Sequence, residues 1–330
     1  MIFEGRLTRY LNETYVKPLA TFTVGLWSMA LIKRETMDSI TFTPLVIFVV
    51  HNIRLLSMAL NLPVFYQRTG SAVVFAIIML AGLLWNDLSF FIIIAAINAL
   101  CLRDYFRLLR KITPGLHWPA WLPISIQLIT CLCLCALYAD HFNLLKAPVI
   151  PLLALLPFVV FIVSGLSRKT ALKASLQALS GPGYITLAML FLLSMRFKDQ
   201  YLPITLIAMI WSNDTLAYLV GSFIGKTPFS PISPKKTWEG TLGGALLTMA
   251  AAIGCGLWIH HFELIDWVAI AFCATFFGTL GDLLESKLKR MAEVKDSGRL
   301  MPGHGGALDR FDSLLVAAPF AATYALYFMH

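Results

Sequence analysis

The feature that most constrains this chain is a succession of apolar stretches that recurs over most of its 330 residues. A helix needs roughly 20 apolar residues to span the hydrocarbon core of a bilayer. Hydrophobic residues make up 58% of the chain and charged residues 13%, a balance too apolar for a water-soluble protein of this length. The sequence therefore predicts an all-α integral membrane protein, a polytopic bundle of about 9–11 transmembrane helices.

Short polar segments separate the expected spans. No internal repeat and no Gly/Ser-rich linker marks off a soluble domain. Residues 1–65 are expected to form a membrane-associated N-terminal extension of one or two helices, and residues 66–330 one membrane domain. The expected spans are residues 18–32, 41–60, 71–86, 88–108, 120–138, 148–166, 175–195, 202–224, 240–260, 264–285 and 312–329.

Lysine and arginine are distributed unevenly among the later loops. Four alternating loops and their adjoining helix ends hold sixteen basic residues, whereas the loops that interleave with them hold only Lys146, Arg196 and Lys198. Positive charge accumulates in the cytoplasmic loops of membrane proteins. The four basic loops are therefore expected to face the cytoplasm, at the inner membrane if the source is bacterial. The same rule accounts for the net charge of +8, so no nucleic-acid partner is expected.

Asp214 stands inside an otherwise apolar span, between Trp211 and Tyr218. A carboxylate within a membrane span indicates function by default, because burying its charge in hydrocarbon is costly. A carboxylate that only pairs with a cation elsewhere in the bundle is the alternative. Asp214 alone does not decide between the two interpretations.

The segment 225–240, which follows this span, contains three prolines, and these prohibit a continuous helix and favour an extended loop. Its hydroxyl and ammonium groups suit a polyphosphate, and glycines at the start of the next span permit close approach of an anion to the backbone. An ordinary cytoplasmic loop would account for the lysines equally well. The candidate residues are Ser233, Lys235, Lys236 and Thr237, with glycines Gly240, Gly243 and Gly244.

Acidic and basic residues are densest between residues 281 and 312. Asp282, Glu285 and Lys289 have the spacing that places side chains on one face of a helix. Asp309 and Asp312 lie where the chain re-enters the bilayer after the loop. Carboxylates from the two ends of the loop can therefore converge. Mg²⁺ prefers hard oxygen ligands and commonly binds one or two carboxylates together with substrate phosphates. The predicted metal ligands are Asp282 and Asp309, with Asp296 and Asp312 as second-tier ligands.

His304 lies among three glycines in the segment 302–306. Such a backbone can expose amide donors to an anion, and the imidazole can donate to a phosphate oxygen or move a proton. A polar loop histidine without a chemical role is the alternative. The nearby Asp296 and Asp309 favour the functional interpretation.

Three of these segments, in this order, resemble the phosphatidate cytidylyltransferase family. The resemblance is strong after Trp211 and rests on hydropathy alone from residue 66 to that point. It is carried by Asp214-Thr-x-Ala-Tyr218, by Ser233-Pro-Lys-Lys-Thr-Trp-Glu-Gly240, and by Ser286-x-Leu288-Lys289-Arg290-x4-Lys295-Asp296-x-Gly298 followed by Pro302-Gly-His-Gly-Gly306-x-x-Asp309-Arg310-Phe311-Asp312.

The resemblance implies transfer of a cytidylyl group from CTP to phosphatidate, giving CDP-diacylglycerol and pyrophosphate in phospholipid biosynthesis. It also implies Mg²⁺ and a nearby monovalent cation, K⁺. The catalytic motifs would then lie within residues 211–313, at the cytoplasmic face. The expected catalytic residues are Asp282, Asp309, Lys289, Arg290 and His304, and the expected substrate-binding residues are Ser233, Lys235, Lys236, Thr237, Asp214, Lys295 and Arg310.

Two other functions stay open. A related CTP-dependent enzyme could act on another lipid phosphate or on a lipid alcohol. An ion-coupled transporter of an anionic solute would also place charges inside a helical bundle, but it would need carboxylates near the bilayer midplane. Here most charges gather at one membrane face and no inverted repeat is visible. A homodimer is a further expectation that the sequence leaves open.

Overall fold

The computed structural model describes residues 76–116, 118–144, 172–298, 300 and 305–329, together with Val74, Val160 and Val163. Within these ranges, seven helices are long and apolar enough to cross a membrane. The predicted all-α polytopic fold is confirmed. The predicted spans 18–32 and 41–60 and almost all of 148–166 lie outside the described residues. Of the predicted span 71–86, residues 76–84 are helical.

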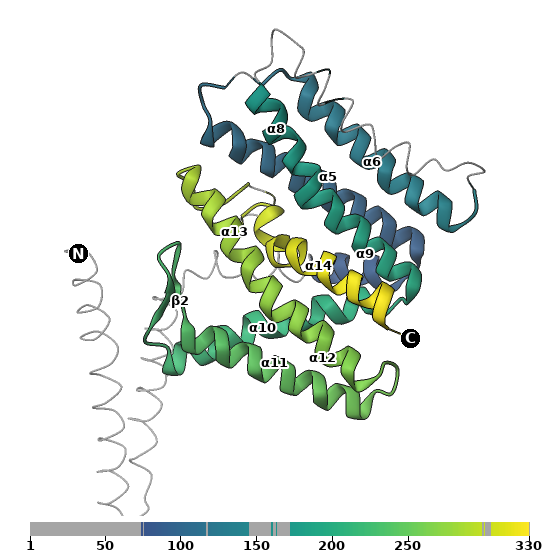
Figure 1. Ribbon diagram of the computed structural model, residues 1–330, viewed down its shortest axis with the longest axis vertical. Coiled ribbons are helices and arrows are strands. Elements are labelled where there is room, and N and C mark those ends of the chain that lie inside the picture. The colour runs from purple at the N-terminus through teal and green to yellow at the C-terminus, as the bar shows by residue number, and fades with distance from the viewer. Residues whose placement is uncertain are drawn as a thin grey trace, which may run out of the picture. The chain divides into compact units, whose positions relative to one another are not determined.

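Figure 1 shows the described helices coloured in chain order. Two of the seven spans are interrupted by a π-helical turn and are named in three parts. The elements are α5 (Asp87–Ile112), α6 (Trp121–His141), α8 (Leu172–Gly181) with η2 (Pro182–Thr186) and α9 (Leu187–Lys198), α10 (Leu202–Ile224), β1 (Pro228–Ser230), β2 (Ser233–Thr237), α11 (Trp238–Trp258), α12 (Leu264–Phe272) with η3 (Cys273–Phe277) and α13 (Gly278–Met291), and α14 (Leu308–Phe328).

Helix α14 lies at the centre of this part of the chain and packs against α9, α13 and η3. Figure 1 shows it between the group formed by α5, α6, α8 and α9 and the group formed by α10 to α13. Its buried face is rich in alanine, and Ala317, Ala318, Ala321, Ala322 and Ala325 are fully buried. Small side chains let helix backbones approach closely, which is the main route to tight packing when lipid supplies no hydrophobic driving force. The last helix therefore joins the two groups.

A seam of small residues joins α10 to α11. A Cβ atom added at Gly244 would lie 2.6 Å from the backbone nitrogen of Ala217, and one added at Gly240 would lie 2.9 Å from Cα of Gly221. Neither distance is compatible with a side chain on a fixed backbone. The close approach that the sequence assigned to an anion is therefore made by a neighbouring helix at Gly240, Gly243 and Gly244, because α10 fills the space beside all three.

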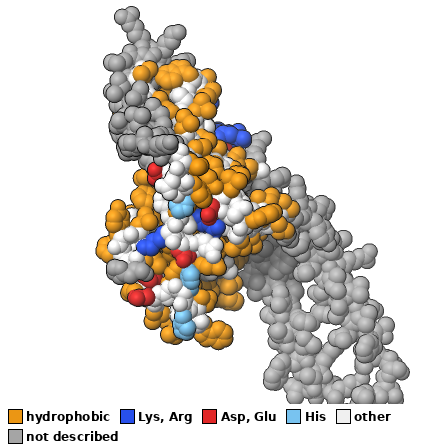
Figure 2. Space-filling view, turned by 90° about the vertical axis from the view of Figure 1, so that its right-hand side faces the viewer, with side chains coloured by type: hydrophobic (Ala, Val, Ile, Leu, Met, Phe, Trp, Pro, Cys, Tyr) orange, Lys and Arg blue, Asp and Glu red, His pale blue; other side chains and the backbone are white. Residues whose placement is uncertain are grey.

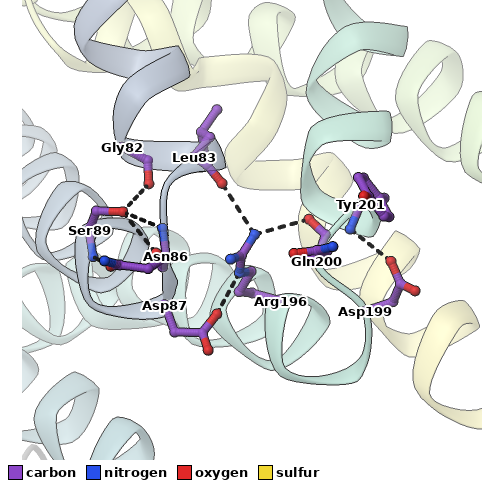
Figure 3. Close-up of polar contacts among 9 residues, drawn as sticks. All are labelled: Gly82, Leu83, Asn86, Asp87, Ser89, Arg196, Asp199, Gln200 and Tyr201. Carbon is purple, nitrogen blue, oxygen red and sulfur yellow. Dashed lines mark hydrogen bonds and ion pairs between the residues drawn. The ribbon is translucent and has the colours of Figure 1, made fainter.

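Polar contacts tie together the helix ends that carry few basic residues. Nε of Arg196, which is buried, donates to Oδ1 of Asp87 at 2.8 Å, and Nη1 donates to the carbonyl oxygens of Leu83 and Gln200 at 3.2 and 3.3 Å (Figure 3). Nζ of Lys198 donates to the carbonyl oxygen of Met329 at 2.7 Å. Figure 2 shows charged and histidine side chains as a narrow strip on a largely hydrophobic face. These interleaving loops therefore meet at one end of the bundle.

Candidate active site

The predicted proline-rich loop is a β-hairpin, in which β1 pairs antiparallel with β2. The backbone N–H groups of Lys226 and Thr227 donate to the carboxylate of Glu239, in the first turn of α11. The backbone N–H of Trp238 donates to the carbonyl oxygen of Thr227 at 2.9 Å. At the helix start, Oγ1 of Thr237 accepts from the N–H of Gly240 at 3.2 Å and caps α11. The hairpin is thus held to the helix that follows it, which positions the lysines of β2.

One pocket of about 490 Å³ collects residues from the span that holds Asp214, from the segment 225–240 and from the helix that holds Asp282. It lies among α10, β2, the start of α11 and α13. Asp214 lines it from α10 and Asp282 from α13. The hairpin contributes Lys235, Lys236 and Thr237. Residues that are distant in sequence therefore meet in a cavity that holds both carboxylate and ammonium groups.

Lys236 and Asp282 form an ion pair across this pocket. Their side chains are 29% and 26% exposed, so both groups remain open to a ligand. Oδ1 of Asp282 also accepts a hydrogen bond from Oγ of Ser286 at 3.2 Å, one turn further along α13. The ammonium group that the sequence assigned to a phosphate and the carboxylate that it assigned to a metal are thus direct neighbours.

Three carboxylates converge beside the pocket, where α13 meets α14. One ligand oxygen from each of Asp282, Glu285 and Asp312 lies within 4.8 Å of the other two. The helices approach closely at Gly281, where an added Cβ atom would lie 3.0 Å from Cα of Ser313. Glu285 is fully buried, and among the described residues its Oε1 atom has no hydrogen-bond partner. Because buried polar atoms are normally paired, this oxygen is suited to a cation.

Asp309 anchors the loop between α13 and α14. Its Oδ1 atom accepts from Nζ of Lys289 at 2.8 Å. Its Oδ2 atom accepts from the N–H and Oγ of Ser297 at 2.9 and 2.8 Å and from the N–H of Gly306 at 2.7 Å. Nζ of Lys289 also lies 2.6 Å from Oε2 of Glu285. Both oxygens of Asp309 are therefore occupied by donors within the protein, and its role as a metal ligand stays a prediction.

Comparison with known proteins identifies the family. Residues 66–328 match the cytidylyltransferase family. This chain belongs to that family. Phosphatidate cytidylyltransferase of Bacillus subtilis (strain 168) is 34% identical over 280 residues, which are 80% of this chain and 96% of that protein. The phosphatidate cytidylyltransferases of Staphylococcus aureus (strain COL) and Staphylococcus saprophyticus are 38% and 37% identical over 139 residues, 41% of this chain and 53% of each relative. The family predicted from the sequence is confirmed.

Several predicted residues of this cytidylyltransferase lie away from the pocket. Lys295 and Asp296 are exposed in the loop after α13. Asp296 is not part of the carboxylate cluster. His304 lies outside the described residues, and so do its neighbours 301–303. The predicted roles of all these residues stay predictions. Three further predicted residues do not line the pocket. They are Ser233 in β2, Arg290 in the last turn of α13 and Arg310 in the first turn of α14.

Sequence reasoning missed Asp104 of α5, which is 3% exposed. Its Oδ2 atom accepts from the N–H of Ala307 at 2.8 Å, just before α14 begins. A Cβ atom added at Gly298 would lie 2.5 Å from Oδ1, so the loop passes directly over this carboxylate. A signal was present, because Asp104 is a carboxylate within an apolar span, like Asp214. The neighbouring Arg103 and Arg107 were interpreted only as evidence for the orientation of the chain in the membrane.

Proposed function

We propose that this chain transfers a cytidylyl group from CTP to phosphatidate in the pocket between α10, the hairpin and α13. The products are CDP-diacylglycerol and pyrophosphate. The observation that carries the proposal is the meeting of Lys236, Asp282 and Asp214 in one cavity, with a carboxylate cluster beside it. Membership of the cytidylyltransferase family and identity with a phosphatidate cytidylyltransferase over 80% of the chain support the reaction.

The lysines of the hairpin are suited to hold the triphosphate. Lys235 and Lys236 both line the pocket, on a strand that its neighbours hold in place. A charge-assisted hydrogen bond from ammonium to phosphate is roughly twice as strong as a neutral one. The Lys236 ammonium group is paired with Asp282 at the pocket and is partly exposed. It can therefore exchange this carboxylate for a phosphate group of CTP when the nucleotide binds. The lysine then neutralises charge where it develops in the transition state.

The attacking group needs little assistance from a base. A phosphate monoester is already an anion at neutral pH, so the phosphate oxygen of phosphatidate can attack the α-phosphorus of CTP directly. Phosphoryl-type transfers depend mainly on positioning and electrostatic stabilisation. The task of the protein is to align two anions that repel each other. The pocket supplies positive side chains on one wall and carboxylates on the other.

The carboxylate cluster fits a divalent cation. Asp282, Glu285 and Asp312 offer hard oxygen ligands within 4.8 Å of one another, and Oε1 of Glu285 has no protein donor in the described part of the chain. Mg²⁺ held there would neutralise and orient the phosphate groups. Glu285 thereby joins Asp282 and Asp312 as a proposed ligand, beside the predicted Asp309. The second expected cofactor, K⁺, and the expected homodimer stay predictions.

The pocket lies at the end of the bundle that carries the basic loops. The chain is an integral multi-pass membrane protein. We place this end in the cytoplasm, because Lys and Arg concentrate on that side of a bilayer. A soluble nucleotide would then reach a lipid that keeps its acyl chains in the membrane. The location of the pocket beside apolar spans agrees with a reaction between one soluble and one membrane substrate.

Mass spectrometry of the products tests the reaction. Detergent-purified chain would be incubated with phosphatidate, CTP and Mg²⁺. We expect CDP-diacylglycerol from the wild type, an at least ~100-fold smaller yield from Asp282→Asn, and an unchanged yield from Asp140→Asn, an exposed carboxylate at the far end of α6. Folded wild type that gives no nucleotide-lipid would contradict the proposal. An active Asp282→Asn variant would remove that residue from the site.

A further inference from the structure

A second cavity lies between α5 and α6 and shares no residue with the active-site pocket. Its volume is about 700 Å³. Leu100 and Phe106 of α5 line it, together with Ile124 and Leu128 of α6. These side chains give the groove an apolar wall that runs along two membrane-spanning helices. Such a wall suits acyl chains.

Four cations line the same groove along α5. They are Arg103, Arg107, Arg110 and Lys111, and all four are exposed. Their spacing places the three arginines on one face of the helix. Among the described residues, no acidic side chain lines the groove. Within the described part of the chain none of the four forms an ion pair with a carboxylate, so the groove has a strong positive charge that the protein does not neutralise.

The position of Arg103 separates this groove from an ordinary positive loop. The rule for cytoplasmic charge explains cations at helix ends and in loops. Arg103 lies about 14 Å along the axis from Ile112, where α5 ends, because each residue of a helix rises about 1.5 Å. An arginine roughly two and a half turns from the end of its helix is costly unless its charge finds a partner or reaches the interface. Apolar side chains line the groove on both sides of this arginine, with Leu100 before it and Phe106 after it along α5.

We propose that the α5–α6 groove binds an acidic glycerophospholipid. The phosphate of the lipid lies on Arg103, Arg107 and Arg110, since the planar guanidinium group matches phosphate oxygens in pairs. Its acyl chains lie along Ile124 and Leu128. An amphipathic anion satisfies both the charged rim and the apolar wall, which neither a neutral lipid nor a free phosphate does. This lipid site is distinct from the pocket proposed for the reaction.

Native mass spectrometry of the detergent-purified full chain tests this site. The probe is phosphatidylglycerol, and phosphatidylcholine of the same acyl composition and glycerol 3-phosphate are the comparisons. We expect phosphatidylglycerol to bind at least ~10-fold more tightly than either comparison, because only it combines an uncompensated negative charge with acyl chains. Equal binding of phosphatidylcholine would overturn the role of the arginines. Equal binding of glycerol 3-phosphate would overturn the role of the apolar wall.

Matched variants localise the binding. We expect Arg107→Ala/Arg110→Ala to weaken phosphatidylglycerol binding at least ~10-fold, and Ile124→Trp to weaken it similarly by filling the groove without a change of charge. Lys173→Ala/Lys287→Ala removes the same charge from exposed positions outside the groove and should leave binding unchanged. Gel filtration would establish that each variant is folded. Equal loss in the lysine variant, or no loss in the other two, would contradict the proposal.

Discussion

The carboxylate of Asp104 accepts a hydrogen bond from the backbone N–H of Ala307, 203 positions later in the chain. Asp104 lies in α5, and Ala307 immediately precedes α14. The loop held by this bond also carries Ser297 and Gly306, which donate to Asp309. The carboxylates of Asp104 in α5 and Asp309 in α14 therefore both hold the loop that borders the carboxylate cluster. We predict that Asp104 is a positioning residue for the proposed site.

Asp104→Asn should lower both stability and turnover. One oxygen becomes an amide group, and its donors would oppose the N–H groups that approach the carboxylate. Loss of a buried, charge-assisted acceptor costs about 1–3 kcal/mol. We expect at least ~10-fold slower formation of CDP-diacylglycerol. Each increase of about 1.4 kcal/mol in the activation free energy, here from displaced groups of the site, lowers the rate about tenfold. The unfolding midpoint and the product yield would be measured together, with Asp140→Asn as the control. Unchanged turnover would leave Asp104 a purely structural residue.

Lys236→Met should weaken the use of CTP. The substitution keeps an unbranched side chain of similar length and removes the charge that pairs with Asp282. A hydrogen bond involving a charged group contributes about 1.5–3 kcal/mol, so kcat/KM for CTP should fall roughly 10–100-fold. Steady-state kinetics with varied CTP would measure this. Lys226→Met changes an exposed lysine in the same loop and should have no such effect. Equal kinetics in the two variants would contradict a phosphate role for Lys236.

Gly244→Ala should separate α10 from α11. The new methyl group would lie 2.6 Å from the backbone nitrogen of Ala217, so the helices would have to move apart. Overpacking of this kind costs about 1–3 kcal/mol. Gly254→Ala is the matched control, because nothing lies within 4 Å of the added methyl group on the same helix. Thermal unfolding in detergent should rank Gly244→Ala below the wild type and Gly254→Ala at or above it. A reversed order would exclude the seam as a source of stability.

Asp87→Asn should destabilise the chain without slowing the reaction. Arg196 is only 4% exposed at its side chain and would lose its carboxylate partner, although two carbonyl oxygens would remain. Because the Asp87 side chain is 40% exposed and solvent screens the pair, we expect a cost of about 1–2 kcal/mol. The Arg196–Asp87 pair lies at the opposite end of the bundle from the pocket, so turnover per folded molecule should be unchanged. Activity normalised to folded protein would reveal any coupling.

Hydropathy predicted the seven spans that the described residues contain, because twenty apolar residues have few alternatives to crossing a bilayer. The prolines of the hairpin likewise predicted an extended loop, and helical spacing placed Glu285 and Lys289 on one face, where they form an ion pair. These inferences rest on local rules. Each needs only a short stretch of sequence and a fixed backbone geometry.

The pairing of helices was not predictable from the same pattern. Lipid is as apolar as the side chains of the spans, so hydropathy does not tell which helix faces which. Asp104 could not be assigned to Ala307, nor Gly244 to Ala217, without the tertiary structure. The occupied oxygens of Asp309 depend on a loop conformation that spacing does not encode. The inclusion of Glu285 in the carboxylate cluster likewise depends on how α13 packs against α14.

The seam between α10 and α11 also limits how this protein can vary. Every single-base change of a glycine codon that alters the amino acid gives a residue with a Cβ atom. At Gly240 and Gly244 that atom would meet the backbone of the facing helix. No one-step substitution at either position leaves the two helices at their present separation. The hairpin lysines are held to the start of α11, so a shift of α11 relative to α10 would also move these lysines within the proposed substrate pocket.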